Sequence, residues 1–264
     1  MKILKIYIIA VIVTFGAVSN LNAQFQSGMS LSGATGLLSI PSGRIGWERG
    51  GPGATAFDFG YHAIISGGNA AHIPKIALNF LNTLELSAAF DIQPQNHPSA
   101  FIGGMKVQLP LRRTALAIGG NYQIINIGRN EHLYFAGQVY VAVTYAGSFF
   151  EAPAETTIVI GRTFREGGRG ASIDFGMGFD MRLFPGVFGS LLHWVTDFSN
   201  FSYSVRPFRA DAYHRGALNT GIRINLSTIP AFSRLRFFAD IMLVDILDQN
   251  RAFAAGVTFG VPLH

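Results

Sequence analysis

Apolar and polar residues alternate along most of the chain beyond residue 54. In the segment 83–93 one stripe consists of Leu84, Leu86, Ala88, Phe90 and Ile92. The residues between them are mostly polar or small and include Glu85, Ser87 and Asp91. Successive side chains of a β-strand point to opposite faces, so a period of two predicts strands with one apolar and one polar face.

Twelve segments with this pattern follow one another, and single-chain bacterial barrels have an even number of strands. They cover residues 54–66, 75–82, 83–93, 99–109, 114–126, 132–146, 156–164, 171–182, 190–198, 216–226, 234–244 and 251–262. Most approach the ~9–11 residues that a tilted strand needs to cross a bilayer, whereas strands in soluble proteins average ~5–6 residues. The pattern predicts an all-β fold: a transmembrane antiparallel β-barrel of about twelve strands, within a range of roughly 10 to 14.

The apolar stripes are almost free of charge. Eleven of them hold no Lys, Arg, Asp or Glu, and the weak stripe in 156–164 includes Arg162 near its end. A charge facing hydrocarbon costs ~2–4 kcal/mol at mid-depth, so uncharged stripes are expected of a lipid-facing surface. A soluble β-sandwich is the alternative, because its inner face is also apolar. Long strands, low charge and small residues on the polar face favour the barrel.

Composition narrows the class further. Charged residues make up 13% of the chain, about half the usual ~25%. Lys and Arg number 20 against 15 Asp and Glu, a mild excess without the clustered basic face that nucleic-acid binding requires. The absence of cysteine excludes disulfides and thiolate catalysis. Beyond residue 23 no apolar run approaches the length of a membrane-spanning helix.

The N-terminus has the layout of a secretory signal peptide. Lys2 and Lys5 precede an apolar run over residues 6–18, and a short polar stretch ends at Ala23. The run is shorter than the ~20 residues of a spanning helix. We therefore expect a signal peptide at 1–23, an N-terminal periplasmic segment or plug at 24–53 and a barrel at 54–264. This organisation predicts a bacterial outer-membrane protein, with the lipid bilayer and the outer-membrane assembly machinery as partners.

The connections predict which end of the barrel faces outward, since such barrels have short periplasmic turns and longer extracellular loops. Residues 82–83 and 110–113 are expected as inner turns, and 148–155 and 227–233 as longer inner connections. Outer loops are expected at 67–73, 94–98, 128–131, 165–170 and 199–215. The last segment, 251–262, has the apolar stripe of a terminal strand through which assembly recognises such proteins.

The polar faces carry charges of both signs. The side chains expected to line the lumen are Asp58, His62, Lys75, Glu85, Asp91, Lys106, Asp174, Asp180, Arg182, Arg223, Arg236 and Asp240. Such groups set selectivity when they line an aqueous path. The same groups are equally compatible with a closed lumen in which they pair with one another.

No pattern of catalytic or metal-binding residues stands out. His62 and His132 fall on predicted lumen faces, whereas His72, His97 and His214 fall in predicted outer loops. Arginines expected near the outer loops, where they are solvated or meet anionic glycans or headgroups, are Arg162, Arg165, Arg169, Arg206, Arg209 and Arg215. We expect no cofactor and no metal site, and catalysis only if Ser, His and Asn meet from separate strands, as in a membrane-embedded lipid hydrolase.

A motif of small residues precedes the first long strand. Its members are Gly33, Gly36, Leu37, Pro41, Ser42 and Arg44, and Gly60-Tyr61 follows in the strand. Over residues 33–61 the chain resembles the opening of the YjbH-like family of outer-membrane proteins. That resemblance implies a β-barrel linked to exopolysaccharide secretion, although better-known members are much longer and are usually lipoproteins.

Three functions follow from these observations. The first is a narrow channel or export component for polar solutes or saccharides. The second is a non-conducting structural or surface-interaction barrel. The third is the lipid hydrolase. Bilayer conductance separates the first two, and phospholipid hydrolysis tests the third.

Overall fold

The computed structural model describes residues 27–46, 55–94, 99–110, 114–127, 133–165, 173–200, 216–247 and 251–263. Its strands are β1 (Thr55–Ser66), β2 (Asn69–Phe80), β3 (Leu84–Asp91), β4 (Ser99–Pro110), β5 (Thr114–Ile127), β6 (Tyr134–Phe149), β7 (Ala152–Arg165), β8 (Ile173–Arg182), β9 (Leu192–Ser199), β10 (Ala217–Asn225), β11 (Arg236–Val244) and β12 (Ala252–Leu263). Residues 1–23, predicted as a signal peptide, lie outside the described residues.

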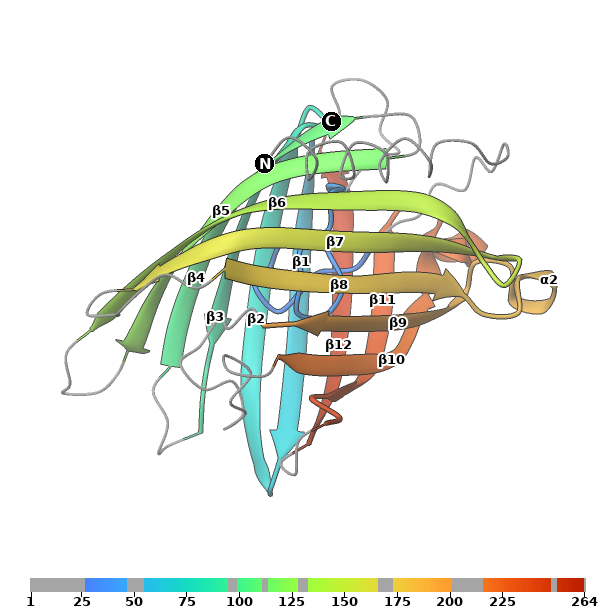
Figure 1. Ribbon diagram of the computed structural model, residues 1–264. Coiled ribbons are helices and arrows are strands. Elements are labelled where there is room, and N and C mark those ends of the chain that lie inside the picture. The colour runs from blue at the N-terminus through green and yellow to red at the C-terminus, as the bar shows by residue number, and fades with distance from the viewer. Residues whose placement is uncertain are drawn as a thin grey trace, which may run out of the picture.

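The twelve strands close into one antiparallel barrel (Figure 1). Each strand pairs with its neighbours in sequence, and β12 pairs with β1 from Leu263↔Thr55 to Phe253↔Ile65. Closure leaves no unpaired sheet edge, which a bilayer does not tolerate because it offers no water to exposed backbone groups. The predicted fold class and strand number are confirmed.

Apolar side chains cover the outside of the wall. In β1 the inward residues Asp58, Gly60 and His62 are buried, while Phe59 and Ile65 point outward and are exposed. The same alternation exposes large apolar side chains on every strand except β10, among them Ile76, Met105, Ile118, Val141, Ile160, Phe175 and Ile241. These rows face away from the interior, as a lipid-facing surface requires.

The two ends of the barrel differ in their connections. At the end where β1 begins and β12 ends, here the inner end, strands are joined by 81–83, 111–113, 150–151, 183–191 and 226–235. At the outer end the joining stretches are 67–68, 92–98, 128–133, 166–172, 200–216 and 245–251, which are longer on the whole. This asymmetry matches short periplasmic turns and longer extracellular loops.

Helical structure in the described residues is confined to the inner end. The helix α2 (Pro185–Phe188) follows β8, and the 3-10 turns η2 (Leu226–Thr228) and η3 (Pro230–Phe232) follow β10. No helix among the described residues is long and apolar enough to cross a membrane.

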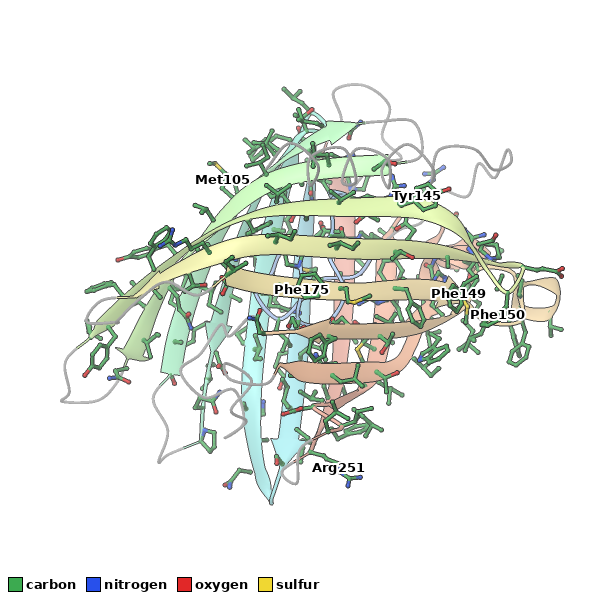
Figure 2. All side chains as sticks on the ribbon, in the orientation of Figure 1. Met105, Tyr145, Phe149, Phe150, Phe175 and Arg251 are labelled. Atoms are coloured by element: carbon green, nitrogen blue, oxygen red, sulfur yellow. The ribbon has the colours of Figure 1, made fainter. Side chains whose placement is uncertain are left out.

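Aromatic side chains gather at the inner end of the outer surface. Phe149 stacks on Phe179 with ring centroids 5.9 Å apart, and Phe179 meets Trp194 edge to face at 5.1 Å. Figure 2 shows Phe149 and Phe150 at the hairpin between β6 and β7, where Phe150 is 90% exposed. Aromatic girdles of this kind mark the level at which a barrel wall meets the bilayer surface.

Several predicted boundaries are wrong because turn chemistry overrides the apolar pattern. The strand predicted to start at residue 75 begins at Asn69, since Gly67 and Gly68 form a two-residue hairpin with positive φ at both residues. His72 therefore lies in β2 and not in an outer loop.

The connection predicted at 148–155 is also shorter than expected. Phe149 pairs with Ala152, so only Phe150 and Glu151 join β6 to β7. Strand β7 is correspondingly longer than predicted and runs from Ala152 to Arg165. Arg162 and Arg165 belong to this strand and not to a loop; the other four predicted loop arginines lie outside the described residues.

Candidate functional site

Residues 27–46, called the lumen segment below, fold back inside the barrel (Figure 1). Two isolated antiparallel bridges, Met29↔Thr35 and Gly36↔Pro41, give it a compact shape. Its ends contact wall residues at the inner end, and its middle contacts β9 further along the barrel. All of its residues except Leu31 and Arg44 are buried, so it occupies the interior of the barrel.

Arg236 fastens the beginning of the lumen segment. Its Nη1 donates to Asp58 Oδ2 at 2.7 Å, which pairs β11 with β1 across β12. The other guanidinium nitrogens donate to the backbone carbonyls of Ser27 and Gly28. Arginine suits this position because its rigid fork of donors serves a carboxylate and carbonyls at once.

Lys75 holds the next turn of the segment. Its Nζ donates to the carbonyls of Met29 at 3.1 Å and Ser30 at 2.8 Å, and to His62 Nδ1 at 2.8 Å. His62 Nε2 lies 3.4 Å from Asp240 Oδ2. A cation, an imidazole and a carboxylate are thus linked in a line that ends on the backbone of the lumen segment.

Arg223 extends this line along the wall. Its Nε donates to Asp240 Oδ1 at 2.8 Å, and its Nη1 lies 3.5 Å from Asp180 Oδ2 and donates to the Gly36 carbonyl at 3.3 Å. His193 Nδ1 is 2.5 Å from Asp180 Oδ1. The buried charges of this region are therefore compensated by opposite charges, as burial in a dry interior demands.

Glu85 and Lys106 form a second clamp, 3.1 Å apart. Glu85 accepts hydrogen bonds from both the N–H and the hydroxyl of Thr35, at 2.8 and 2.5 Å. Lys106 Nζ donates to the carbonyls of Thr35 at 3.0 Å and Arg44 at 2.7 Å. Near the C-terminal end of the lumen segment, Arg44 Nε donates to Glu155 Oε1 at 2.5 Å.

Asp197 receives the tip of the lumen segment. One of its oxygens accepts from the N–H groups of Leu38 and Ser39, each at 2.7 Å. The other accepts from the Ser39 hydroxyl at 2.8 Å and from Asn219 Nδ2 at 2.6 Å. A carboxylate that accepts several N–H and O–H donors is a strong attachment point, because such hydrogen bonds are assisted by charge.

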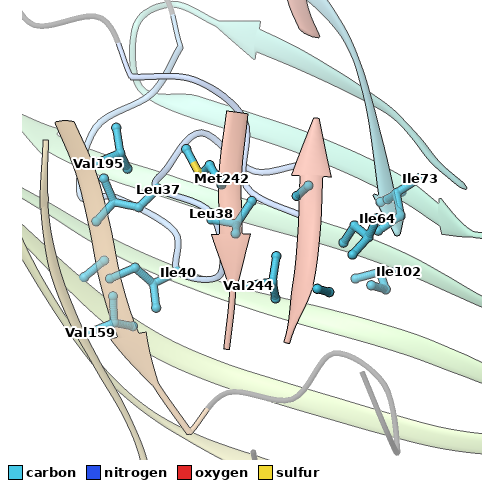
Figure 3. Close-up of a cluster of buried hydrophobic side chains, with 14 of the residues drawn as sticks. Leu37, Leu38, Ile40, Ile64, Ile73, Ile102, Val159, Val195, Met242 and Val244 are labelled. Carbon is cyan, nitrogen blue, oxygen red and sulfur yellow. The ribbon is translucent and has the colours of Figure 1, made fainter. Parts of the chain in front are cut away.

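The tip also packs against apolar side chains within the lumen (Figure 3). Leu37, Leu38 and Ile40 belong to one buried cluster with residues from nine strands of the wall. The larger wall members are Ile64, Ile73, Ile102, Tyr140, Val159, Val195, Met242 and Val244. The lumen is therefore less polar than the alternating pattern suggests, because an apolar ring surrounds the tip.

The motif residues of the sequence all lie in the lumen segment. Gly33 has φ +89°, and a Cβ at this position would lie 2.8 Å from the Ala88 carbonyl oxygen, so the wall leaves no room for a side chain. Leu37 packs in the apolar cluster, Pro41 ends the Gly36 bridge, and Ser42 N–H donates to the Thr35 carbonyl. The motif thus shapes the segment and docks it to the wall.

The predicted lumen residues lie on the inward face. Asp58, His62, Lys75, Glu85, Asp91, Lys106, Asp174, Asp180, Arg223, Arg236 and Asp240 are all buried, and Arg182 is half-buried at the inner end of β8. Nine of them, all except Asp91, Asp174 and Arg182, make the contacts with the lumen segment, or with its wall partners, described above. Asp91 and Asp174 lie near the outer ends of their strands, away from these clamps.

Sequence reasoning missed Asp197, Glu155 and His193. Asp197 and His193 share the inward face of β9 with Val195, so the alternation in that strand carried the signal. Glu155 was assigned to a connection, because its strand was expected to begin one residue later. The backbone N–H groups that Asp197 meets had no signal in the sequence.

Each histidine that the structure describes has at least one side-chain partner. His62 contacts Lys75 and Asp240, His193 contacts Asp180, and the exposed His72 lies with its Nδ1 2.5 Å from Tyr61 Oη on the outer surface. His97, His132 and His214 lie outside the described residues. Among the residues described, no group of three His, Asp or Glu side chains is placed to hold a metal ion.

No protein-family model and no curated protein matches this sequence. Among solved structures, the chain is similar to the KdgM porin, with a TM-score of 0.52 and 6% identity over 76% of this chain and 98% of that one. A second match is the outer-membrane protein Omp33 of Acinetobacter baumannii, with a TM-score of 0.45 and 10% identity over 80% and 99% of the two chains. The first likeness shows that this chain has the fold of an outer-membrane β-barrel.

Proposed function

We propose that this protein lies in the bacterial outer membrane and passes polar solutes through its lumen, with the lumen segment as the gate. The apolar outer surface and the aromatic girdle at the inner end support the location. The exposed apolar stripe of β12, which includes Phe253, Val257 and Phe259, supports recognition by the assembly machinery.

The observation that carries the proposed passage is the charged wall beneath the lumen segment. Burying an ion pair costs several kcal/mol per ion in desolvation, and apolar residues of similar volume often seal a core with equal or greater stability. Lys75, Lys106 and Arg236 direct their charge to backbone carbonyls of the segment. When the segment withdraws, it leaves behind a wall that binds water, as a conducting path requires.

The proposed solute is a saccharide or another small polar molecule. The resemblance of residues 33–61 to the YjbH-like family supports a link to exopolysaccharide. The motif residues that carry this resemblance lie in the gate, and Gly36, Ser42 and Arg44 bond to the wall, so the proposal connects the family likeness to a physical role.

A non-conducting barrel is the second candidate, and one observation favours it. The inward side chains are almost all buried, including Ile64, Ile73 and Ile102 beyond the tip of the lumen segment. In such a barrel the buried charges of the wall only specify how the interior packs, and the lumen segment stays inside the barrel.

A hydrolase is not proposed. His62 contacts a lysine and a carboxylate, His193 contacts a carboxylate and the Ser190 carbonyl, and His72 contacts a tyrosine. In none of these contacts does an imidazole meet a serine hydroxyl, as the activation of a serine nucleophile needs.

Conductance of the refolded protein in a planar bilayer tests the gate. We expect the wild type to open rarely. Asp197→Asn removes the charge that strengthens the hydrogen bonds from Leu38 and Ser39, each worth ~1.5–3 kcal/mol. The amide N–H₂ of the new side chain is also a donor, so it cannot accept a hydrogen bond from the donors that now meet a carboxylate oxygen. Release of the tip is therefore expected to raise the open fraction roughly tenfold or more.

Thr258→Val is the matched control. Thr258 is buried and inward-facing on β12, and its hydroxyl has no hydrogen-bond partner among the described residues. This variant is expected to conduct like the wild type. If neither the wild type nor Asp197→Asn conducts, although heat-modifiable mobility on gels shows that both are folded, the channel is contradicted and the non-conducting barrel is supported.

A further inference from the structure

A row of small and polar side chains crosses the lumen wall, from the middle of β3 and β4, beside the Glu85–Lys106 clamp, to the outer part of β7. Strand register places Ser87 of β3 opposite Gly104, Gly104 opposite Asn121, Asn121 opposite Gln138 and Gln138 opposite Thr163. Directly opposed residues of adjacent strands point to the same face. The row therefore presents amides and hydroxyls to the lumen across β3 to β7.

Hydrogen bonds join the row into one unit. Asn121 Nδ2 donates to Gln138 Oε1 at 3.0 Å, and Gln138 Nε2 donates to Asp174 Oδ2 at 2.8 Å and Thr163 Oγ1 at 3.1 Å. The Thr163 hydroxyl also donates to Asp174. These bonds fix the orientation of the amides, and a fixed set of donors and acceptors is what a ligand-binding wall needs.

Two polar atoms of this wall have no hydrogen-bond partner among the described residues. They are Asn121 Oδ1, an acceptor, and Gln123 Nε2, a donor. The two residues share the inward face of β5 and are more than nine-tenths buried, at 8% and 6% exposure. Buried polar groups are nearly always paired, so an orphaned donor and acceptor side by side call for an explanation.

The wall facing this row is apolar. Ile64, Met242 and Val244 are inward-facing residues of β1 and β11, and Ala252 and Ala254 continue the surface on β12. A sugar ring has the matching character, because its hydroxyls both donate and accept while its C–H faces are apolar. On the inward face of β3 to β8, the charged side chains described in the outer half are Asp91 and Asp174, both carboxylates.

We infer that Asn121, Gln123 and Gln138 form a subsite for a neutral, hydroxyl-rich solute, a neutral saccharide in chemical class. This inference rests on the proposed channel and names the solute that the channel prefers. The orphaned acceptor and donor each take one hydroxyl, and the carboxylate of Asp174 disfavours anionic sugars through like-charge repulsion.

Block of single-channel current by a sugar tests the subsite. The probe is maltotriose, added to the full-length mature protein carrying Asp197→Asn so that the lumen is open. Gln123→Met removes the orphaned donor at similar volume, and we expect the half-blocking concentration to rise about fivefold, the effect of one lost hydrogen bond. Asn121→Leu is expected to act in the same direction and guards against a folding defect in the first variant.

The controls separate this subsite from the channel itself. Thr258→Val, on the same background, is expected to leave the half-blocking concentration unchanged. Trigalacturonate is expected to block weakly until Asp174→Asn removes the repelling charge. Current that maltotriose does not modulate, or that it modulates equally in Gln123→Met and Thr258→Val, overturns the subsite alone. Absence of current in every variant overturns the channel and the subsite together.

Discussion

At the scale of single residues, the interior depends on charges whose partners are backbone atoms. Arg236 joins Asp58 on the wall to the carbonyls of Ser27 and Gly28 in the lumen segment. Both charged side chains are fully buried. A buried charge is tolerated only beside an opposite charge, so the loss of either residue leaves the other as an unpaired buried charge.

Arg236→Met tests this dependence. The substitution leaves the Asp58 carboxylate buried without its cation, and the free energy of unfolding is expected to fall by about 3–5 kcal/mol. Adding Asp58→Asn is expected to restore a large part of the loss, because the amide needs no counter-ion and Asn79 remains beside it. Urea unfolding in lipid vesicles measures both variants. Simple additivity of the two losses would contradict a direct pairing.

At the scale of elements, tight hairpins set where strands begin and end. Both central residues have positive φ in the turns at Gly67–Gly68 and Phe150–Glu151, and each turn directly joins two paired residues. Right-handed strand twist favours such turns, in which glycine and asparagine are comfortable and other residues are strained. The first turn has the expected glycines and the second does not, but both are shorter than the connections predicted from the sequence, at 67–73 and 148–155.

Glu151→Gly is predicted to stabilise the β6–β7 hairpin. Glu151 has φ 66°, a conformation that costs an ordinary residue roughly 1–2 kcal/mol and glycine almost nothing. Part of this gain is offset by the greater freedom of glycine in the unfolded chain. The expected rise in the free energy of unfolding is therefore about 1 kcal/mol. Gly68→Glu, the reverse substitution at the second position of the other turn, is the control and should lower the free energy of unfolding. A lower free energy of unfolding in Glu151→Gly would contradict the turn assignment.

At the scale of the whole molecule, the outer surface forms a continuous apolar belt. Strand register aligns Val107, Ile118, Val141, Ile160 and Phe175 across β4 to β8, each opposite the next. All five are exposed. A belt that continues from strand to strand is what the hydrocarbon core of a bilayer requires, whereas isolated exposed apolar residues are ordinary on soluble proteins.

Ile118→Arg is predicted to destabilise the barrel in membranes. An arginine facing lipid near mid-depth costs about 2–4 kcal/mol, and equilibrium unfolding in phospholipid vesicles measures this loss. Leu81→Arg is the control, because Leu81 is exposed in the inner turn, outside the belt. Equal stability of the two variants would argue that this surface does not contact hydrocarbon.

The barrel was readable from the sequence because its signal is local and repeated. A period of two shows in each strand independently, and a lipid-facing stripe excludes charge at every position. The same alternation placed Asp58, Lys75 and Arg236 on the inward face before any pairing was known. Boundaries were less accurate, because His72 and Pro74 interrupt the apolar stripe of β2 beside the Gly67–Gly68 hairpin, so the connection was predicted to extend to residue 73.

The sequence by itself determined a closed antiparallel wall with an apolar outside and a charged inside. Only the tertiary structure decided what the charges meet: Asp197 binds the tip of the lumen segment, and Lys75, Lys106 and Arg236 bind its carbonyls. The physical reason is that the lumen segment has no periodicity and is held through backbone atoms that every residue possesses. Which backbone atom faces which side chain depends on closure of the whole barrel, and no local pattern encodes it.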